Sequence, residues 1–146
     1  MKSIRKINLT MVLWIACTGL MAQNNPDEII GTWETDTRDA KMEVYKNGEV
    51  YFGKLLWGDK IVESDGKTSK RDSKNPDENL RTRNIIGIVN LTGLQFQDGE
   101  YINGKIYDPP SGKTYDCKAW IQDKQLHLRG FIGFSLLGRT AIWHRL

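Results

Sequence analysis

Short alternating runs of apolar and polar residues, each closed by turn-forming residues, are the feature that most restricts how this chain can fold. The pattern is clearest in the stretch Gly99 to Ile121, where a run over residues 101–107 is answered by a second over 114–121. The intervening residues are Asp108-Pro109-Pro110-Ser111-Gly112. Proline fixes φ, glycine permits positive φ, and Asp and Ser bond their own backbone, so this segment favours a turn. The stretch therefore predicts an antiparallel hairpin.

Similar runs occupy most of the remaining chain, and no long helical period or internal repeat interrupts them. They cover residues 30–35, 42–45, 50–57, 85–96, 125–131 and 139–145. Asn47-Gly48, between two of these runs, is a strong signal for a two-residue hairpin turn. Gly53, inside the third run, indicates a bulge or bend. The sequence thus predicts an all-β fold of about eight to nine strands, either an antiparallel sandwich or a single up-and-down β-barrel.

The first 22 residues have the composition of an export signal. Met1 to Lys6 is short and basic, and residues 7–21 are mostly apolar without charge. We predict cleavage after Ala22, which leaves residues 23–146 as one domain in the periplasm or outside the cell. Two alternatives stay open. One is an uncleaved anchor, although the apolar run is shorter than the ~20 residues of a membrane span; the other is lipidation at Cys17.

The excess of positive charge belongs to this leader. The formal net charge of +3 equals the contribution of Lys2, Arg5 and Lys6, and residues 1–22 contain no acid. Residues 23–146 are therefore formally neutral. This balance gives no reason to expect a nucleic-acid partner or an anionic membrane surface as a partner.

Residues 58–84 differ from the rest because they are long, polar and rich in both signs of charge. Connections of this length are uncommon in compact domains and are usually functional or mobile. We expect a solvated flap, with a short strand at Ile61-Val62 and a helical turn between Pro76 and Leu80. A functional loop remains the alternative.

The residues offer no constellation for catalysis, metal binding or a cofactor, so we expect no enzyme. His127 and His144 each alternate with apolar neighbours and are expected to face solvent. Ser135 lacks the glycine pattern of a nucleophile elbow. The acidic run that begins at Asp72 lacks the spacing of a calcium loop. Cys117 is the only cysteine outside the leader, and its alternation with Ala119 favours a buried, unreactive position.

An ordered set of short motifs resembles the bacterial family of small exported proteins called domain of unknown function 2147 (DUF2147). The motifs are Gly31-x-Trp33, Gly53-Lys54, Asp72 with Asn75-Pro76 and Arg81, Gly104-Lys105-Ile106-Tyr107-Asp108-Pro109, Ser111-Gly112-Lys113-x-Tyr115, Arg129-Gly130, Gly133, Gly138-Arg139 and Trp143-x-Arg145. The resemblance implies a lipocalin-like barrel over nearly the whole of residues 23–146. It implies no reaction, because no activity is established for that family.

The opening Gly31-x-Trp33 is also similar to that of lipocalins. In lipocalins this tryptophan closes one barrel end, and an arginine of the last strand packs over its ring. The resemblance implies the same pair here, with Arg139 as the first candidate and Arg145 as the second. Such a cation–π contact is worth roughly 0.5–2 kcal/mol. We expect Trp33 to be a structural plug.

Large aromatic residues share strand faces with small residues, a combination that suits either tight packing or a cavity. An eight-stranded barrel is just wide enough for side chains alone or for one small ligand. We predict that the ligand-binding residues are Tyr51, Trp57, Tyr107, Tyr115, Arg129 and Trp143. Arg129 would bind a carboxylate or phosphate, although alternation with Leu128 also allows it to point outward.

Two classes of function follow from this pattern. The first is an exported carrier of a small apolar or amphipathic molecule, which holds its ligand inside the barrel. The second is an envelope interaction or inhibitor protein that contacts a protein partner through loops on a filled barrel. The presence or absence of an internal cavity separates the two.

Overall fold

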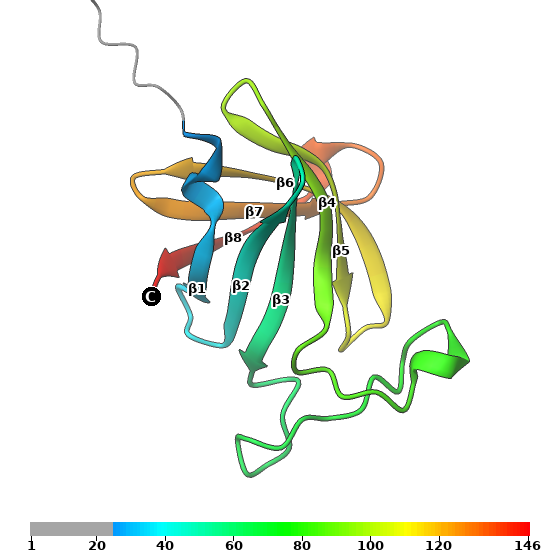
Figure 1. Ribbon diagram of the computed structural model, residues 1–146. Coiled ribbons are helices and arrows are strands. Elements are labelled where there is room, and N and C mark those ends of the chain that lie inside the picture. Colours follow the sequence, from blue (N-terminus) through cyan, green and yellow to red (C-terminus); the bar gives the residue numbers. More distant parts are fainter. Residues whose placement is uncertain (1–24) are drawn as a thin grey trace, which may run out of the picture.

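The computed structural model describes residues 25–146. The predicted signal peptide, its cleavage after Ala22 and the lipidation alternative at Cys17 lie outside these residues. Eight strands form one closed antiparallel barrel in which each strand pairs with the next along the chain (Figure 1). They are β1 (Gly31–Thr35), β2 (Ala40–Asn47), β3 (Val50–Gly58), β4 (Val89–Gln97), β5 (Glu100–Asp108), β6 (Lys113–Gln122), β7 (Gln125–Phe131) and β8 (Arg139–Arg145).

The barrel prediction is confirmed, and the sandwich alternative is wrong because the sheet has no open edge. β8 pairs with β1, with Trp33 opposite Arg145 and Thr35 opposite Trp143. The predicted hairpin over 99–121 is present as β5 and β6, with Ile106 opposite Tyr115. The register of β3 against β4 shifts on both sides of Gly53, which is the bulge that this glycine indicated.

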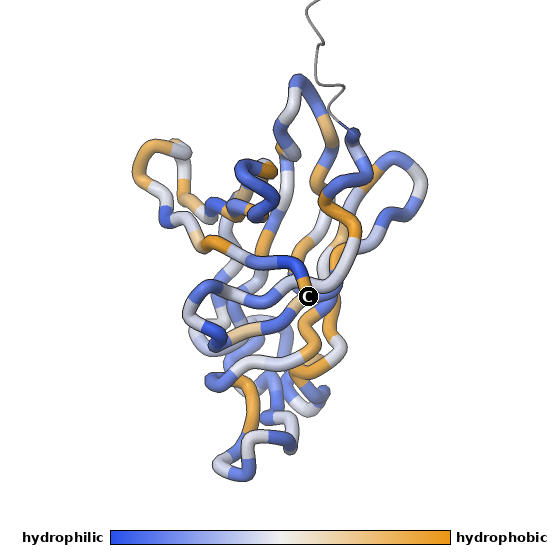
Figure 2. The backbone as a smooth tube through the Cα atoms, turned by 90° about the vertical axis from the view of Figure 1, so that its left-hand side faces the viewer, coloured by the Kyte–Doolittle hydropathy of each residue, from blue (hydrophilic) through white to orange (hydrophobic). Residues whose placement is uncertain are grey.

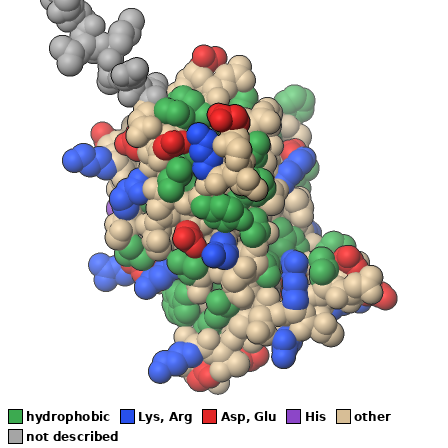
Figure 3. All heavy atoms as spheres, viewed as in Figure 1, with side chains coloured by type: hydrophobic (Ala, Val, Ile, Leu, Met, Phe, Trp, Pro, Cys, Tyr) green, Lys and Arg blue, Asp and Glu red, His purple; other side chains and the backbone are tan. Residues whose placement is uncertain are grey.

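Alternation along the strands separates an inner from an outer surface. Cys117 and Ala119 on β6 point inward and are buried, as predicted, and burial raises the pKa of the Cys117 thiol to about 12. His127 stacks on Trp120 at a centroid distance of 5.2 Å, on the outer surface. Charged side chains of both signs are interspersed over the face in Figure 3, consistent with the formal neutrality of residues 23–146.

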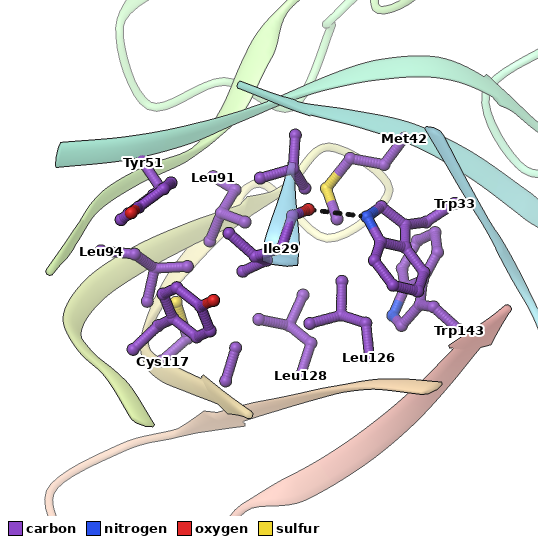
Figure 4. Packing of buried hydrophobic residues seen from close by; sticks show 13 residues of the cluster. Ile29, Trp33, Met42, Tyr51, Leu91, Leu94, Cys117, Leu126, Leu128 and Trp143 are labelled. Atoms are coloured by element: carbon purple, nitrogen blue, oxygen red, sulfur yellow. Dashed lines mark hydrogen bonds between the residues drawn. The ribbon is translucent and has the colours of Figure 1, made fainter. Parts of the chain in front are cut away.

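One end of the barrel is closed by η1, a 3-10 turn over Pro26–Ile29. The Trp33 indole N–H donates to the Ile29 carbonyl oxygen at 2.9 Å (Figure 4). Tyr101 Oη donates to the Pro26 carbonyl oxygen at 2.8 Å. Ile29, Trp33 and Tyr101 are all buried in one hydrophobic core. This end is therefore filled by side chains.

The arginine that packs over Trp33 is Arg145, the second candidate; the preference for Arg139 is wrong. The Arg145 guanidinium carbon lies 4.2 Å from the centroid of the Trp33 ring. The same guanidinium donates to the Ile30 and Glu28 carbonyl oxygens, which ties β8 to η1. Arg145 has this position because it pairs directly with Trp33 across β8 and β1, whereas Arg139 lies opposite Gly130, near the other end of β8.

Residues 59–88, which connect β3 to β4, are more ordered than a solvated flap, so that expectation is wrong. The segment carries its own hydrophobic cluster of Ile61, Ile85 and Ile88 against Leu55. The expected helical turn is present as η2 (Glu78–Leu80), while Ile61-Val62 contributes only an isolated bridge, from Val62 to Ser69. In Figure 1 this long connection lies below the barrel, at the end opposite η1.

The Asp72 carboxylate joins this connection to the barrel. Asp72 is fully buried, and it accepts hydrogen bonds from Asn75 Nδ2 at 2.8 Å, Arg83 Nε at 2.9 Å and Tyr107 Oη at 2.6 Å. Burial, with the hydrogen bond to Asp72, raises the pKa of Tyr107 to about 12. A buried carboxylate is stable only when it is paired and hydrogen-bonded in this way. Asp72 and its partners therefore fix the long connection over the barrel end.

Candidate functional site

A cavity of about 450 Å³ occupies the barrel interior at the end that faces the long connection. Its wall includes the turn residues Asp39 and Asp59 and the last residue of β5, Asp108, together with inward residues of the strands. Because consecutive strands run in opposite directions, the turns β1–β2, β3–β4 and β5–β6 meet at this end. The cavity is therefore at the opposite end from η1.

Decreasing size of the inward side chains explains why the cavity lies there. Along β7 toward this end, Leu126 and Leu128 are followed by Gly130. Along β8 in the same direction, Trp143 is followed by Ala141. Gly130 and Ala141 both line the cavity, as does Leu128. Closely packed interiors leave no space of this size unless the side chains are too small to fill it.

Four of the six predicted ligand-binding residues line this cavity. They are Trp57, Tyr107, Tyr115 and Trp143. Tyr115 lies on β6 opposite Ile106, and Trp143 lies on β8 opposite Leu126, so both point inward by strand alternation. Tyr107 is placed by its bond to Asp72. The structure thus brings together aromatic side chains from β3, β5, β6 and β8 around one space.

Trp57 lines the cavity, although a bulge in the sheet interrupts the alternation that it shares with Tyr51 in the sequence. The register between β2 and β3 shifts between Lys41 and Met42, so Trp57 lies opposite Lys41 while Leu55 lies opposite Met42. The Trp57 indole N–H donates to the Gly66 carbonyl oxygen at 2.9 Å, in the long connection. Trp57 therefore lies where the connection meets the cavity.

Tyr51 does not line the cavity, because it lies at the closed end. It is buried in the core, where it meets Tyr101 edge to face with ring centroids 5.3 Å apart. Its hydroxyl donates to Asp27 Oδ1 at 2.8 Å. This hydrogen bond, together with a second one from Lys46, lowers the pKa of Asp27. Parity along β3 correctly predicted an inward side chain but could not tell which end of the barrel it would occupy.

Arg129 does not line the cavity either, because it points outward from β7. Its guanidinium donates to the carbonyl oxygens of Ser135 at 2.5 Å and Leu136 at 3.0 Å, and to Thr140 Oγ1 at 2.9 Å. The inward residues of this strand are Leu126, Leu128 and Gly130, as simple alternation requires. Its assignment as an anion-binding residue is therefore wrong, and its contacts are to the loop between β7 and β8.

Asn90 and Arg139 are polar cavity residues that the sequence analysis did not assign to ligand binding. Arg139 shares its strand face with Ala141 and Trp143, so the alternation of β8 was a signal that could have identified it. Within residues 25–146, Arg139 makes no ion pair and its side chain no hydrogen bond. Asn90 lies at the start of β4, inside the run 85–96 that the sequence predicted as a strand, and residues 85–88 of that run belong instead to the long connection.

Two buried polar atoms without hydrogen-bond partners belong to residues of this cavity. They are Asn90 Oδ1 and Trp143 Nε1, and no other buried side-chain atom in the described part of the chain lacks a partner. One is an acceptor and the other a donor. Buried polar groups are almost always satisfied, by protein, water or ligand. Asn90 and Trp143 both line the cavity, although the two orphan atoms themselves are covered by protein.

No group of three or more His, Cys, Asp or Glu among residues 25–146 is arranged to hold a metal ion. Within the same residues, no helix has the length and apolar composition needed to cross a membrane. The cavity combines aromatic faces, small aliphatic residues and a cation, which is a typical composition of a binding pocket.

The architecture and the cavity together define a lipocalin-like β-barrel, and comparison with known proteins agrees. The chain is similar to a solved structure described as protein HP1028 from the human pathogen Helicobacter pylori, which belongs to the lipocalin family. The two share 25% sequence identity with a TM-score of 0.68, over 81% of this chain and 82% of that chain. No curated protein matches the sequence.

The particular family is also shown by sequence. Residues 31–145 match the family described as uncharacterized protein conserved in bacteria (DUF2147), so this chain belongs to that family. The structure explains several of its motif residues: Asp72 and Asn75 form the buried polar cluster with Tyr107, and Arg81 donates to the Asn75 carbonyl oxygen. At Gly112, where φ is +71°, a Cβ would lie 2.1 Å from the Lys74 carbonyl oxygen, so only glycine fits.

Proposed function

We propose that this protein is an exported binding protein that holds a small apolar or amphipathic molecule in the barrel cavity. The observation that carries the proposal is the barrel cavity itself, which is walled mainly by aromatic and aliphatic side chains and has a few polar residues, Asn90 and Arg139 among them. The cavity volume of about 450 Å³ is within the range of roughly 300–1,000 Å³ found for small-molecule sites. An apolar ligand with a polar group would satisfy both features.

The position of Arg139 supports a ligand whose negatively charged or strongly polar end lies near the cavity mouth. Arg139 lies four residues from Trp143 on the same strand, which is a separation of about 13 Å along β8. A guanidinium can bind a carboxylate or phosphate through two parallel hydrogen bonds. The acids of the mouth are Asp39 and Asp59, in turns, and Asp108, at the end of β5. Because they repel an anion, they favour a negatively charged end of the ligand that lies toward β8.

The proposed location is the periplasm or the space outside the cell. The support is the basic and then apolar composition of residues 1–22. A carrier of apolar molecules fits such a compartment, because its ligands are poorly soluble in water. We propose no catalytic step, no cofactor and no nucleic-acid partner.

Titration of delipidated protein with fatty acids and fatty alcohols of matched chain length tests this proposal. Tryptophan emission reports binding, because Trp57 and Trp143 line the cavity. We expect saturable binding that weakens at least tenfold in Ala141→Leu, which fills the space. Arg139→Gln is expected to weaken the acid and leave the alcohol unchanged, with Arg38→Gln, an exposed turn arginine, as the matched control. No saturable change with any chain length would sink the proposal.

The runner-up is an envelope interaction or inhibitor protein that uses its loops. The specific observation in its favour is the loop between β7 and β8, which exposes several large apolar side chains. This alternative does not need a ligand in the barrel. It predicts that the Ala141→Leu variant still binds its protein partner, whereas the carrier proposal predicts that this variant loses ligand binding.

A further inference from the structure

The loop between β7 and β8, residues 132–138, is the most apolar exposed segment of residues 25–146. Its large side chains are exposed as follows: Ile132 72%, Phe134 77%, Leu136 89% and Leu137 81%. Figure 2 shows the loop as a hydrophobic segment at the upper left that stands out from the barrel, before the start of β8 and away from the C-terminus. Contiguous exposed apolar side chains mark an interaction site on a soluble domain. The loop is separate from the orphan atoms of the cavity.

The loop is held in this exposed form by contacts to its backbone. The Arg129 guanidinium binds the carbonyl oxygens of Ser135 and Leu136 from the barrel side. The amide of Leu137 donates to Phe134 and that of Gly138 to Ser135, each at 3.1 Å, within the 3-10 turn η3 (Ser135–Leu137). Much of the backbone polarity is thus satisfied inside the protein. That property matters for a segment that enters an apolar phase, where unpaired backbone groups are costly.

The charges around the loop favour an anionic surface. Residues 131–138 contain no charged side chain, and the nearest charges along the chain are Arg129 and Arg139, one on each side. No Asp or Glu follows Asp123. In space, Asp116 lines a hollow with Phe134 and Ser135, where it is paired with Lys105 and lies beside Lys118. Apolar residues flanked by cations are typical of segments that lie in the interface of a membrane containing anionic lipids. The neutral balance of residues 23–146 as a whole concealed this local asymmetry.

We propose that residues 132–138 insert into the surface of a membrane that contains anionic phospholipid. Ile132, Phe134, Leu136 and Leu137 enter the acyl boundary, and Arg139 remains at the level of the headgroups. Docking of this loop does not require that the cavity hold a ligand. The loop also lies near the cavity: a hollow beneath Ile132 and Leu137 shares Tyr115, Gly130 and Arg139 with it. A ligand could therefore pass between bilayer and barrel beside the docked loop.

Vesicle flotation tests the docking. The protein purified after expression of the whole chain is mixed with vesicles of phosphatidylcholine alone or with one quarter phosphatidylglycerol. We expect flotation with the anionic vesicles, weaker flotation with the neutral ones, and a decrease as salt is raised. Leu136→Ser/Leu137→Ser should lower the partition coefficient at least tenfold. Val89→Ser, which removes an exposed apolar side chain from β4, should leave it unchanged.

The outcomes distinguish a lipid partner of the loop from a protein partner, and they distinguish docking of the loop from ligand binding in the cavity. All variants must keep the unfolding midpoint of the wild type, which is expected because these side chains are exposed. Absence of flotation with anionic vesicles overturns the proposal, as does equal flotation of the double variant. Self-association that the double variant abolishes, without flotation of the wild type, would assign the loop to a second copy instead. Fatty-acid titration of the double variant should be unchanged, so failure of docking and failure of ligand binding are distinguishable.

Discussion

The two ends of the barrel are built from the same eight strands, yet one is filled and the other is hollow. At the filled end the inward residues are large, among them Trp33, Tyr51 and Tyr101, and η1 covers them with hydrogen bonds. At the hollow end the inward residues include Gly130 and Ala141, and a long connection crosses the opening. The comparison teaches that side-chain size along each strand decides where a barrel has room.

The two ends are also fixed by different contacts. The filled end depends on apolar burial and on one cation–π contact between Arg145 and Trp33. At the hollow end the connection is held by the cluster of Ile61, Ile85 and Ile88 against Leu55, and also by the buried carboxylate of Asp72 with Arg83 and Tyr107. Polar bonds in a buried setting are directional, so they can fix a loop over an opening that side chains do not fill.

The largest effect is expected at the filled end. Trp33→Ala removes a fully buried indole together with its bonds, and such changes cost about 3–5 kcal/mol. That is much of the free energy of unfolding of a typical domain, about 5–15 kcal/mol. Urea unfolding measures it. Trp120→Ala, on the outer surface, is the control and should cost under about 1 kcal/mol; equal losses in both variants would contradict the plug.

The next effect is expected at the hollow end. Asp72→Ala leaves Asn75, Arg83 and Tyr107 without their acceptor and should cost about 2–4 kcal/mol, reduced because Arg83 is partly exposed. Limited proteolysis should then cut faster within residues 59–88. Glu63→Ala, an exposed acid of the same connection, should change neither quantity. Unaltered proteolysis in Asp72→Ala would show that other contacts hold the connection.

Substitution of Arg145 and of Arg139, at opposite ends of β8, compares the two barrel ends in one unfolding experiment. Arg145→Ala should lower the free energy of unfolding by about 1–2 kcal/mol, since it removes the cation–π contact and two bonds to carbonyl oxygens of η1 and its C-cap. Arg139→Ala should change it by less than about 0.5 kcal/mol. Thermal and urea unfolding measure both. The reverse order would restore Arg139 as the partner of Trp33.

The smallest effect concerns alkaline pH. The folded pKa of Tyr107 is raised to about 12, above the unfolded value of about 10, so the folded state keeps its proton longer. The resulting stability is complete below pH 10 and is lost as pH rises toward 12. We expect a shallower decline between these values in Tyr107→Phe than in the wild type. Tyr45→Phe, on the outer surface of β2, is the control, and an equal decline in all three proteins would contradict the assignment.

The sequence by itself determined the strands, most of their turns and the inward positions. Its alternation correctly placed Cys117, Tyr115 and Trp143 on inner faces, because a strand projects successive side chains to opposite sides. The ordered motifs correctly identified the family and the barrel. Both kinds of information are local: they depend on neighbours within a few residues.

Tertiary structure alone decided which end of the barrel each inward residue occupies and which partner it meets. Tyr51 and Trp57 lie near opposite ends of β3, and the bulge near Trp57 breaks the parity that they share in sequence. The choice of Arg145 over Arg139 depends on the register with which β8 closes on β1. The partners of Asp72 come from positions up to 35 residues away. Such contacts follow from the register and shear of the closed sheet, which no local pattern in the sequence encodes.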